Sequence, residues 1–85
     1  MKKVTSLAEL RSMIVDNNIH DYFILLNGNI RSSKTIDVTD DCSKFCIVNE
    51  IDGTEQVLSE SEMMDRNFTN IGYAIQNGAF FTYDY

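Results

Sequence analysis

Apolar residues recur at helical spacing in the first part of the chain. Between Leu7 and Ile14 they stand three and four positions apart, which places them on one stripe of an α-helix. Ser6, followed by Glu9 three residues later, forms a capping box for the free amides of a first helical turn. An Asn-Asn pair beginning at Asn17 is a typical helix end. The pattern predicts a helix from about Leu7 to Asn17.

The middle of the chain follows the two-residue period of β-strands instead. Its apolar residues either run together or keep to one parity, as strands with one or two buried faces require. The four runs are residues 22–26, 30–38, 44–51 and 54–58. Four strands are therefore predicted in this region.

Two short polar breaks join these strands in pairs. Asn-Gly at 27–28 and Asp-Gly at 52–53 tolerate the left-handed backbone of tight turns. They predict two β-hairpins. A two-residue turn at 52–53 would place Glu50 opposite Glu55, so that two carboxylates meet near the hairpin tip.

The C-terminal third predicts two short helices and a last strand. Ser59 and Glu62 form a second capping box, and Asn70 is a candidate cap for a further helix that ends before Gly78. Residues 79–85 are rich in aromatic side chains and are expected to form the final strand. The expected core residues are Leu10, Ile14, Phe23, Leu25, Ile47, Val48 and Ile75.

Together these elements predict one α+β domain over residues 1–85. Its mainly antiparallel sheet has four to five strands, from two hairpins and a C-terminal strand. An N-terminal helix and two short C-terminal helices pack on this sheet. A chain of 85 residues is sufficient for one core and no more.

Composition adds an expectation about the compartment. A hydrophobic share of 44% favours a folded chain despite the net charge of -6. Met1 is followed by two lysines and then a charged amphipathic segment, which is unlike a secretory signal, and no apolar run is long enough to span a bilayer. We expect a cytoplasmic protein with no membrane contact and with Cys42 and Cys46 as free thiols.

Candidate chemistry is sparse. The single histidine, His20, has Asp21 beside it, but neighbouring side chains diverge and no nucleophile or phosphate loop accompanies them. Cys42 and Cys46 supply two thiols where a structural zinc site needs four ligands. We therefore expect no catalytic residue, no cofactor, no metal and no enzymatic activity.

The charge distribution is the feature that favours a function. Nine acids and one base lie between Asp37 and Asp65. We expect the chain to bind a protein with a basic surface through an acidic one. The residues predicted to form that surface are Asp37, Asp40, Asp41, Glu50, Asp52 and Glu55.

Two alternatives accompany this hypothesis. In the first, the acids imitate the phosphates of a nucleic acid and so inhibit a nucleic-acid-binding enzyme, as an antagonist of host defence carried by a phage or mobile element would. Direct binding to nucleic acid is disfavoured by an isoelectric point near 4.4. A solvated charged face with no partner is the plainest interpretation, and the oligomeric state stays open.

Three segments carry a resemblance. Residues 22–34, residues 49–56 and the Asn-Ile-Gly at 70–72 resemble short uncharacterised proteins of bacterial mobile elements. The resemblance implies a bacterial origin in a phage or a conjugative element. It implies no activity and assigns no role to any residue.

Overall fold

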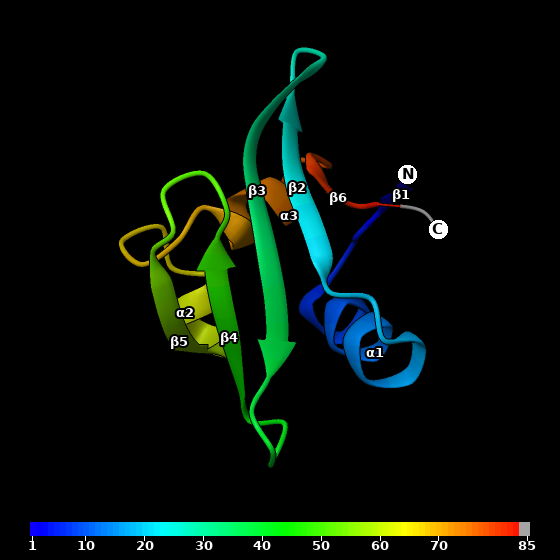
Figure 1. The fold of residues 1–85 in the computed structure, drawn as a ribbon. Coiled ribbons are helices and arrows are strands. Elements are labelled where there is room, and N and C mark those ends of the chain that lie inside the picture. Colours follow the sequence, from blue (N-terminus) through cyan, green and yellow to red (C-terminus); the bar gives the residue numbers. More distant parts are fainter. Residues whose placement is uncertain (84–85) are drawn as a thin grey trace.

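One antiparallel sheet of six strands and three helices make up the fold in the computed structural model, which describes residues 1–83 (Figure 1). The sheet order is β1-β6-β2-β3-β4-β5. The strands are β1 (Lys2–Lys3), β2 (Asp21–Leu26), β3 (Asn29–Val38), β4 (Lys44–Asn49), β5 (Glu55–Ser59) and β6 (Phe80–Thr82). The helices are α1 (Leu7–Asn17), α2 (Glu60–Met63) and α3 (Ile71–Gln76).

The predicted fold class is confirmed, with one strand more than expected. The two hairpins, the C-terminal strand, the N-terminal helix and the two short helices are all present. The additional strand is β1, which pairs Lys2 with Thr82 and Lys3 with Phe81 of β6. A two-residue strand has no local pattern, so only its long-range pairing reveals it. The expected strand at 79–85 is shorter, and its last two residues lie outside the described part.

The caps of the helices follow the sequence signals at two of three positions. The Ser6 hydroxyl accepts from the amide of Glu9 at the start of α1, and α2 carries the complete capping box of Ser59 and Glu62. Asn70 is the N-cap residue of α3, as predicted, but its side chain makes no capping hydrogen bond. The amide of Ile71 donates instead to the hydroxyl of Thr69, which leaves the Asn70 side chain free for other contacts.

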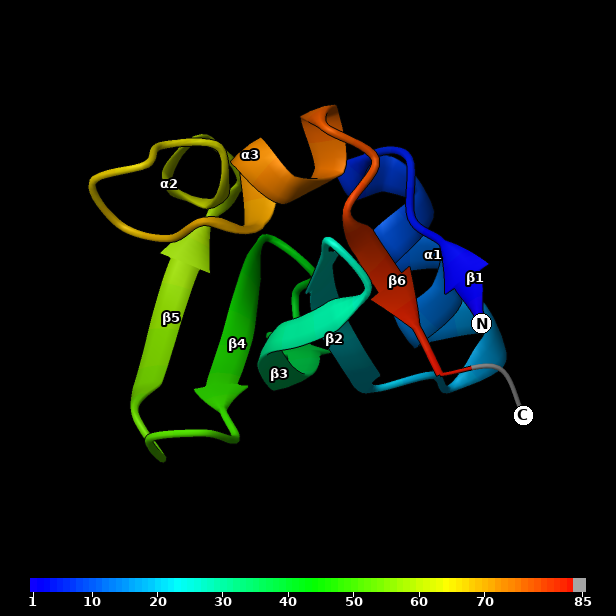
Figure 2. The same cartoon turned by 90° about the horizontal axis from the view of Figure 1, so that it is seen from above.

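All three helices pack on one face of the sheet, which we call the inner face (Figure 2). Buried side chains of α1, α2 and α3 join inner-face residues such as Tyr22, Ile36 and Phe45 in one cluster. Of the seven expected core residues, five are buried. Leu25 and Val48 are half-buried, since they point to the opposite face, where no described element covers the sheet.

A β-bulge changes which residues of β3 face inward. Pairing shifts between Ile24 and Leu25, so Ile30 pairs with Leu25 and is 51% exposed. Lys34 meanwhile lies on the inner face opposite Tyr22 and is only 8% exposed. Burial lowers the pKa of its amine, while the charge of Asp52 acts in the opposite direction. The two-residue period of the sequence alone would put Ile30 on the same face as Ile36.

The predicted register of the β4–β5 hairpin is also wrong. Val48 lies opposite Glu55, and the Asn49 amide donates to the Thr54 carbonyl, so residues 50–53 form a longer loop. Gly53 has the predicted left-handed backbone, with φ of 73°. Glu50 therefore does not face Glu55 across the hairpin.

Close contact between α2 and α3 depends on the absence of a side chain at Gly72. A Cβ atom there would lie 2.6 Å from the Met64 Cα and 2.8 Å from the Met63 carbonyl oxygen. We predict that Gly72→Ala lowers the free energy of unfolding by about 1 to 2 kcal/mol, because overpacking against backbone exceeds the roughly 1 kcal/mol gain in helix propensity. Urea denaturation measures the difference.

Gln76→Ala is the matched control for this prediction. Gln76 is exposed on the same helix, and its replacement should change stability by less than about 0.5 kcal/mol. A Gly72→Ala protein as stable as the wild type would show that the two helices separate without cost.

Candidate functional site

No described element covers the face of the sheet opposite the helices, and we call it the outer face. Its side chains come from alternate positions of five strands, as the pairing registers show. The principal outer-face residues are Phe23, Leu25, Thr35, Asp37, Cys46, Val48, Glu55, Val57 and Phe81.

Aromatic side chains cover one half of the outer face. The rings of Phe23 and Phe81 stack with centroids 5.8 Å apart, and the Tyr83 ring lies 4.6 Å from Phe23. These contacts leave Phe23 only 3% exposed although no helix lies over it. Val57, near the other edge, is 58% exposed. The outer face thus combines a preformed aromatic cluster with accessible aliphatic surface.

Three of the six predicted acids lie on the β3–β5 half of this face. Asp37 and Glu55 occupy exposed outward positions of β3 and β5. Glu50 follows β4, and its carboxylate accepts a hydrogen bond from the Thr35 hydroxyl. Asp21, which belongs to β2, lies opposite Thr35 of β3. Within residues 1–83, none of Asp37, Glu50 and Glu55 forms an ion pair, so their charges are available to a partner.

The other three predicted acids lie in the two loops at opposite ends of the sheet. Asp40 and Asp41 belong to the β3–β4 connection, and Asp52 belongs to the β4–β5 loop at the other end (Figure 1). The Asp52 carboxylate accepts from the amide and hydroxyl of Thr54, which lowers its pKa. The six acids are therefore divided among a face and two loop tips and do not form one patch.

Asp41 closes its own loop. Its carboxylate accepts from the hydroxyl and the amide of Ser43 and from the hydroxyl of Thr39, at 2.7, 3.0 and 2.8 Å. These hydrogen bonds favour the ionised form and lower the pKa of Asp41 from 3.8 to about 2. This carboxylate contributes to folding, as in other Asx turns.

The Asp41 hydrogen bonds predict an acid-dependent loss of stability. Because the folded pKa lies below the unfolded value, the contribution is present above about pH 4 and is lost as the pH falls toward 2. The difference in melting temperature between wild type and Asp41→Asn should therefore shrink over that interval. Asp40→Asn is the control, since the Asp40 carboxylate accepts no hydrogen bond from a described residue. A constant difference across the interval would contradict the assignment.

His20 is held by the backbone and by its neighbour. Its Nδ1 lies 3.0 Å from the Ile36 carbonyl oxygen, and its Nε2 lies 2.8 Å from the Asn18 side-chain oxygen. Both ring nitrogens thus connect the end of α1 to β3. Cys42 and Cys46 are free thiols, the first exposed and the second half-buried on the outer face.

Comparisons of the chain with protein-family models, with curated proteins and with solved structures find no significant match. No helix within residues 1–83 has the length and apolar character needed to cross a membrane. The case for function rests on the outer face and its surroundings.

The aromatic part of the outer face was missed at the sequence level. The sequence predicts Phe23 as a core residue and residues 79–85 as a final strand, but it does not predict that their aromatic rings meet on the outer face. The three consecutive large residues from Tyr22 to Ile24 indicate a strand that is buried on both faces. Such a strand needs side chains packed over each of its two faces. Here the second cover for Phe23 is Phe81 and Tyr83 and not a helix.

Proposed function

We propose that this protein is a non-catalytic binding protein whose outer face docks a protein partner with a basic surface. The observation that carries the proposal is the uncovered sheet face itself, on which three unpaired carboxylates stand beside exposed aliphatic and clustered aromatic side chains. An apolar area with a charged rim is the usual composition of a protein-binding surface.

The charge of the outer face favours a basic partner. Asp37, Glu50 and Glu55 surround the aliphatic part of the face, whereas its bases, Lys3 and Lys44, lie at the far edge strand and at the start of β4. A basic partner converts the repulsion among these carboxylates into attraction and accelerates association. A second copy of the chain would bring the same carboxylates together across a two-fold interface, which disfavours self-association.

The nucleic-acid mimic receives less support from this geometry. A mimic needs a row of carboxylates whose spacing matches the phosphates of one nucleic-acid strand, about 3.4 Å along the helix axis. The six acids are instead divided between two strands, β3 and β5, and the two loops at opposite ends of the sheet. We therefore favour recognition of a protein surface over competition with nucleic acid.

Comparative capture tests the proposal. The wild-type protein, a Glu50→Lys/Glu55→Lys variant and an Asp16→Lys/Asp40→Lys control are immobilised, and bound proteins from a bacterial lysate are quantified. The two variants change the net charge equally, but only the first alters the outer face. We expect at least one basic protein that the wild type and the control retain and the outer-face variant loses. Equal retention by all three would refute the proposal, as would a partner that elutes independently of salt.

A further inference from the structure

One edge of the sheet is formed by β5, which has no strand beyond it within residues 1–83. β5 pairs with β4 in a continuous register, and Val57 at its centre is 58% exposed. Natural proteins protect such an edge with a proline, a lysine, a bulge or a covering segment. β5 contains neither proline nor lysine, and its register has no bulge. Its edge is therefore suited to pairing with an added strand.

The hydrogen bonds between β5 and β4 identify the main-chain groups that face this edge. The Asn49 amide donates to the Thr54 carbonyl. Residues of an antiparallel pair alternate between hydrogen-bonded and non-bonded positions, so every second residue after Thr54 bonds to β4. The residues between them, Glu55 and Val57, direct their N–H and C=O groups away from β4.

Glu55 and Val57 thus present main-chain groups that no other residue uses. Within residues 1–83, their outward N–H and C=O groups have no hydrogen-bond partner. The Ser59 amide, next in the same series, donates to the Glu62 carboxylate at 2.9 Å, so the capping box of α2 ends the free edge there. Unpaired N–H and C=O groups in a row are the template that a further strand requires.

The two sides of β5 offer different surroundings to an added strand. On the outer face, Val57 borders a shallow hollow that Cys46 and Val48 of β4 also line. On the helix side, the Gln56 amide donates to the Phe68 carbonyl at 3.1 Å and so ties the segment between α2 and α3 to β5 (Figure 2). Side chains of an added strand would therefore meet apolar surface on the outer face.

The charge around β5 selects the occupant of this edge. Residues 52–65 contain five acids and no base. Arg11 pairs with Glu60, but within residues 1–83 the other four acids form no ion pair. These four are Asp52, Glu55, Glu62 and Asp65. A second copy that paired through the same edge would bring two such segments together, whereas a basic segment is attracted to them.

We propose that β5 accepts an extended basic segment of the partner protein as a seventh, antiparallel strand. The inference rests on the proposed function and specifies how the partner of that function binds. Partner residues opposite Glu55 and Val57 exchange main-chain hydrogen bonds with them, and their side chains lie on the outer face. A basic side chain suits the position opposite Glu55, and an apolar side chain suits the position opposite Val57.

The test uses the peptide Thr-Lys-Thr-Val-Thr-Lys-Thr as the probe, and two-dimensional NMR of the full chain follows the amide signals during titration. With its valine opposite Val57, the peptide places one lysine opposite Glu55. We expect saturable shifts at Glu55 and Val57 and none at Val15, which is exposed on α1. The absence of saturable shifts at β5 would overturn the proposal.

Two methylated forms of the peptide separate strand addition from charge attraction, because both keep the charge of the probe. Methyl groups on the lysine and valine amides remove the donors that face β5, and binding should weaken about tenfold or more. Methyl groups on the internal threonine amides point away from β5 and should leave binding nearly unchanged. Equal binding by the two methylated peptides, or the reverse order, would overturn the proposal.

A proline at position 57 makes the same distinction on the protein. Val57→Pro removes an N–H that faces away from β4, so no hydrogen bond of the sheet is lost. Val57→Ala is the matched control, since it removes the same side chain and keeps the N–H. We expect Val57→Pro to bind the unmodified peptide about tenfold or more weakly than Val57→Ala. If Val57→Pro does not fold, the two methylated peptides decide.

The same variants distinguish failure of this inference from failure of the proposed function. A captured partner that binds Val57→Pro and Val57→Ala equally would overturn strand addition and leave docking on the outer face intact. Peptide binding at β5 without any charge-dependent partner in the lysate would support the edge and refute the proposed function. Shifts at Glu55 and Val57 that follow protein concentration without peptide would assign the edge to a second copy and overturn the proposal.

Discussion

Replacing Phe80 with alanine should remove about 3 to 5 kcal/mol from the free energy of unfolding. Phe80 is fully buried on the inner face, and its ring stacks on that of Tyr22 with centroids 5.5 Å apart. Its backbone also pairs with Ile24 and accepts from the Val4 amide. The side chain therefore supports the contact among β1, β6 and β2, where the two ends of the chain join the sheet.

This loss is large against the total stability of such a domain. At about 0.05 to 0.15 kcal/mol per residue, 85 residues give roughly 4 to 13 kcal/mol. Urea denaturation should therefore place Phe80→Ala near the limit of folding at room temperature. If that variant proves too unstable to measure, Phe80→Leu keeps an apolar side chain and should lose less.

Phe81→Ala is the matched control one residue further along the same strand. Phe81 points to the outer face and is half-buried against Phe23. Its replacement exposes Phe23 but opens no enclosed cavity, so the expected loss is clearly smaller than that of Phe80→Ala. Equal losses at the two positions would contradict the assignment of inner and outer faces.

Reversing the charges of Glu50 and Glu55 should weaken partner binding about tenfold or more at low salt. Each substitution replaces an attraction to a basic partner with a repulsion, and the main effect is on the association rate. The difference from wild type should diminish near 1 M salt, where the Debye length is about 3 Å. Calorimetric titration of the captured partner at two salt concentrations measures both effects.

The control variant in this titration is Asp16→Lys/Asp40→Lys. It changes the net charge equally, but Asp16 lies on α1 and Asp40 in the β3–β4 loop. If the control and the outer-face variant lose affinity equally, only the net charge of the protein matters. Circular dichroism of each variant verifies that the fold is retained.

Local signals were sufficient for the elements of this fold. The capping residues Ser6 and Ser59 and the apolar spacing of α1 each specify structure within one or two turns. The left-handed backbone at Gly53 is likewise local, since an Asp-Gly step in a hairpin favours it. These features depend on residues that are close in sequence, and they are confirmed.

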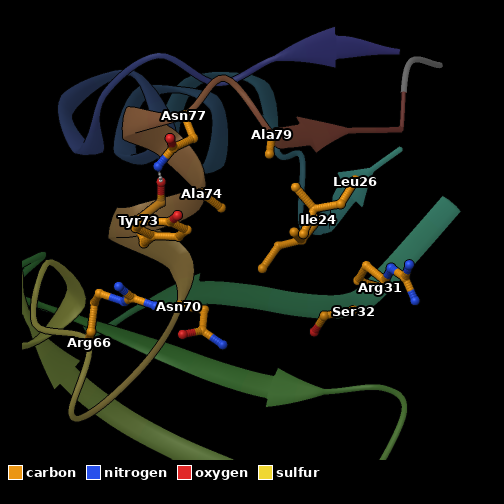
Figure 3. A pocket seen from close by; sticks show the side chains of 10 residues that line it. All are labelled: Ile24, Leu26, Arg31, Ser32, Arg66, Asn70, Tyr73, Ala74, Asn77 and Ala79. Atoms are coloured by element: carbon orange, nitrogen blue, oxygen red, sulfur yellow. Dashed lines mark hydrogen bonds between the residues drawn. The ribbon is translucent and has the colours of Figure 1, made fainter. Parts of the chain in front are cut away.

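Features that depend on distant partners were not predictable. The bulge beside Leu25 turns Ile30 outward, and its position is set by the pairing of β2 with both β3 and β6. The four-residue loop at 50–53 shifts the β4–β5 register by two residues and so removes the expected contact between Glu50 and Glu55. The pocket between α3 and the β2–β3 hairpin (Figure 3) likewise combines residues that are distant in sequence, such as Ile24 and Ala74.

Methyl cross-saturation NMR tests the central claim most directly, because it maps where the captured partner touches this protein. Val57 on the outer face and Val15 on α1 are comparably exposed, at 58% and 52%. The proposed docking mode predicts that saturation from the partner attenuates the methyl signals of Val57 and Val48 and leaves those of Val15 unchanged. Attenuation of Val15 with full intensity at Val48 and Val57 would place the partner on the helical side and contradict the outer face as the binding surface.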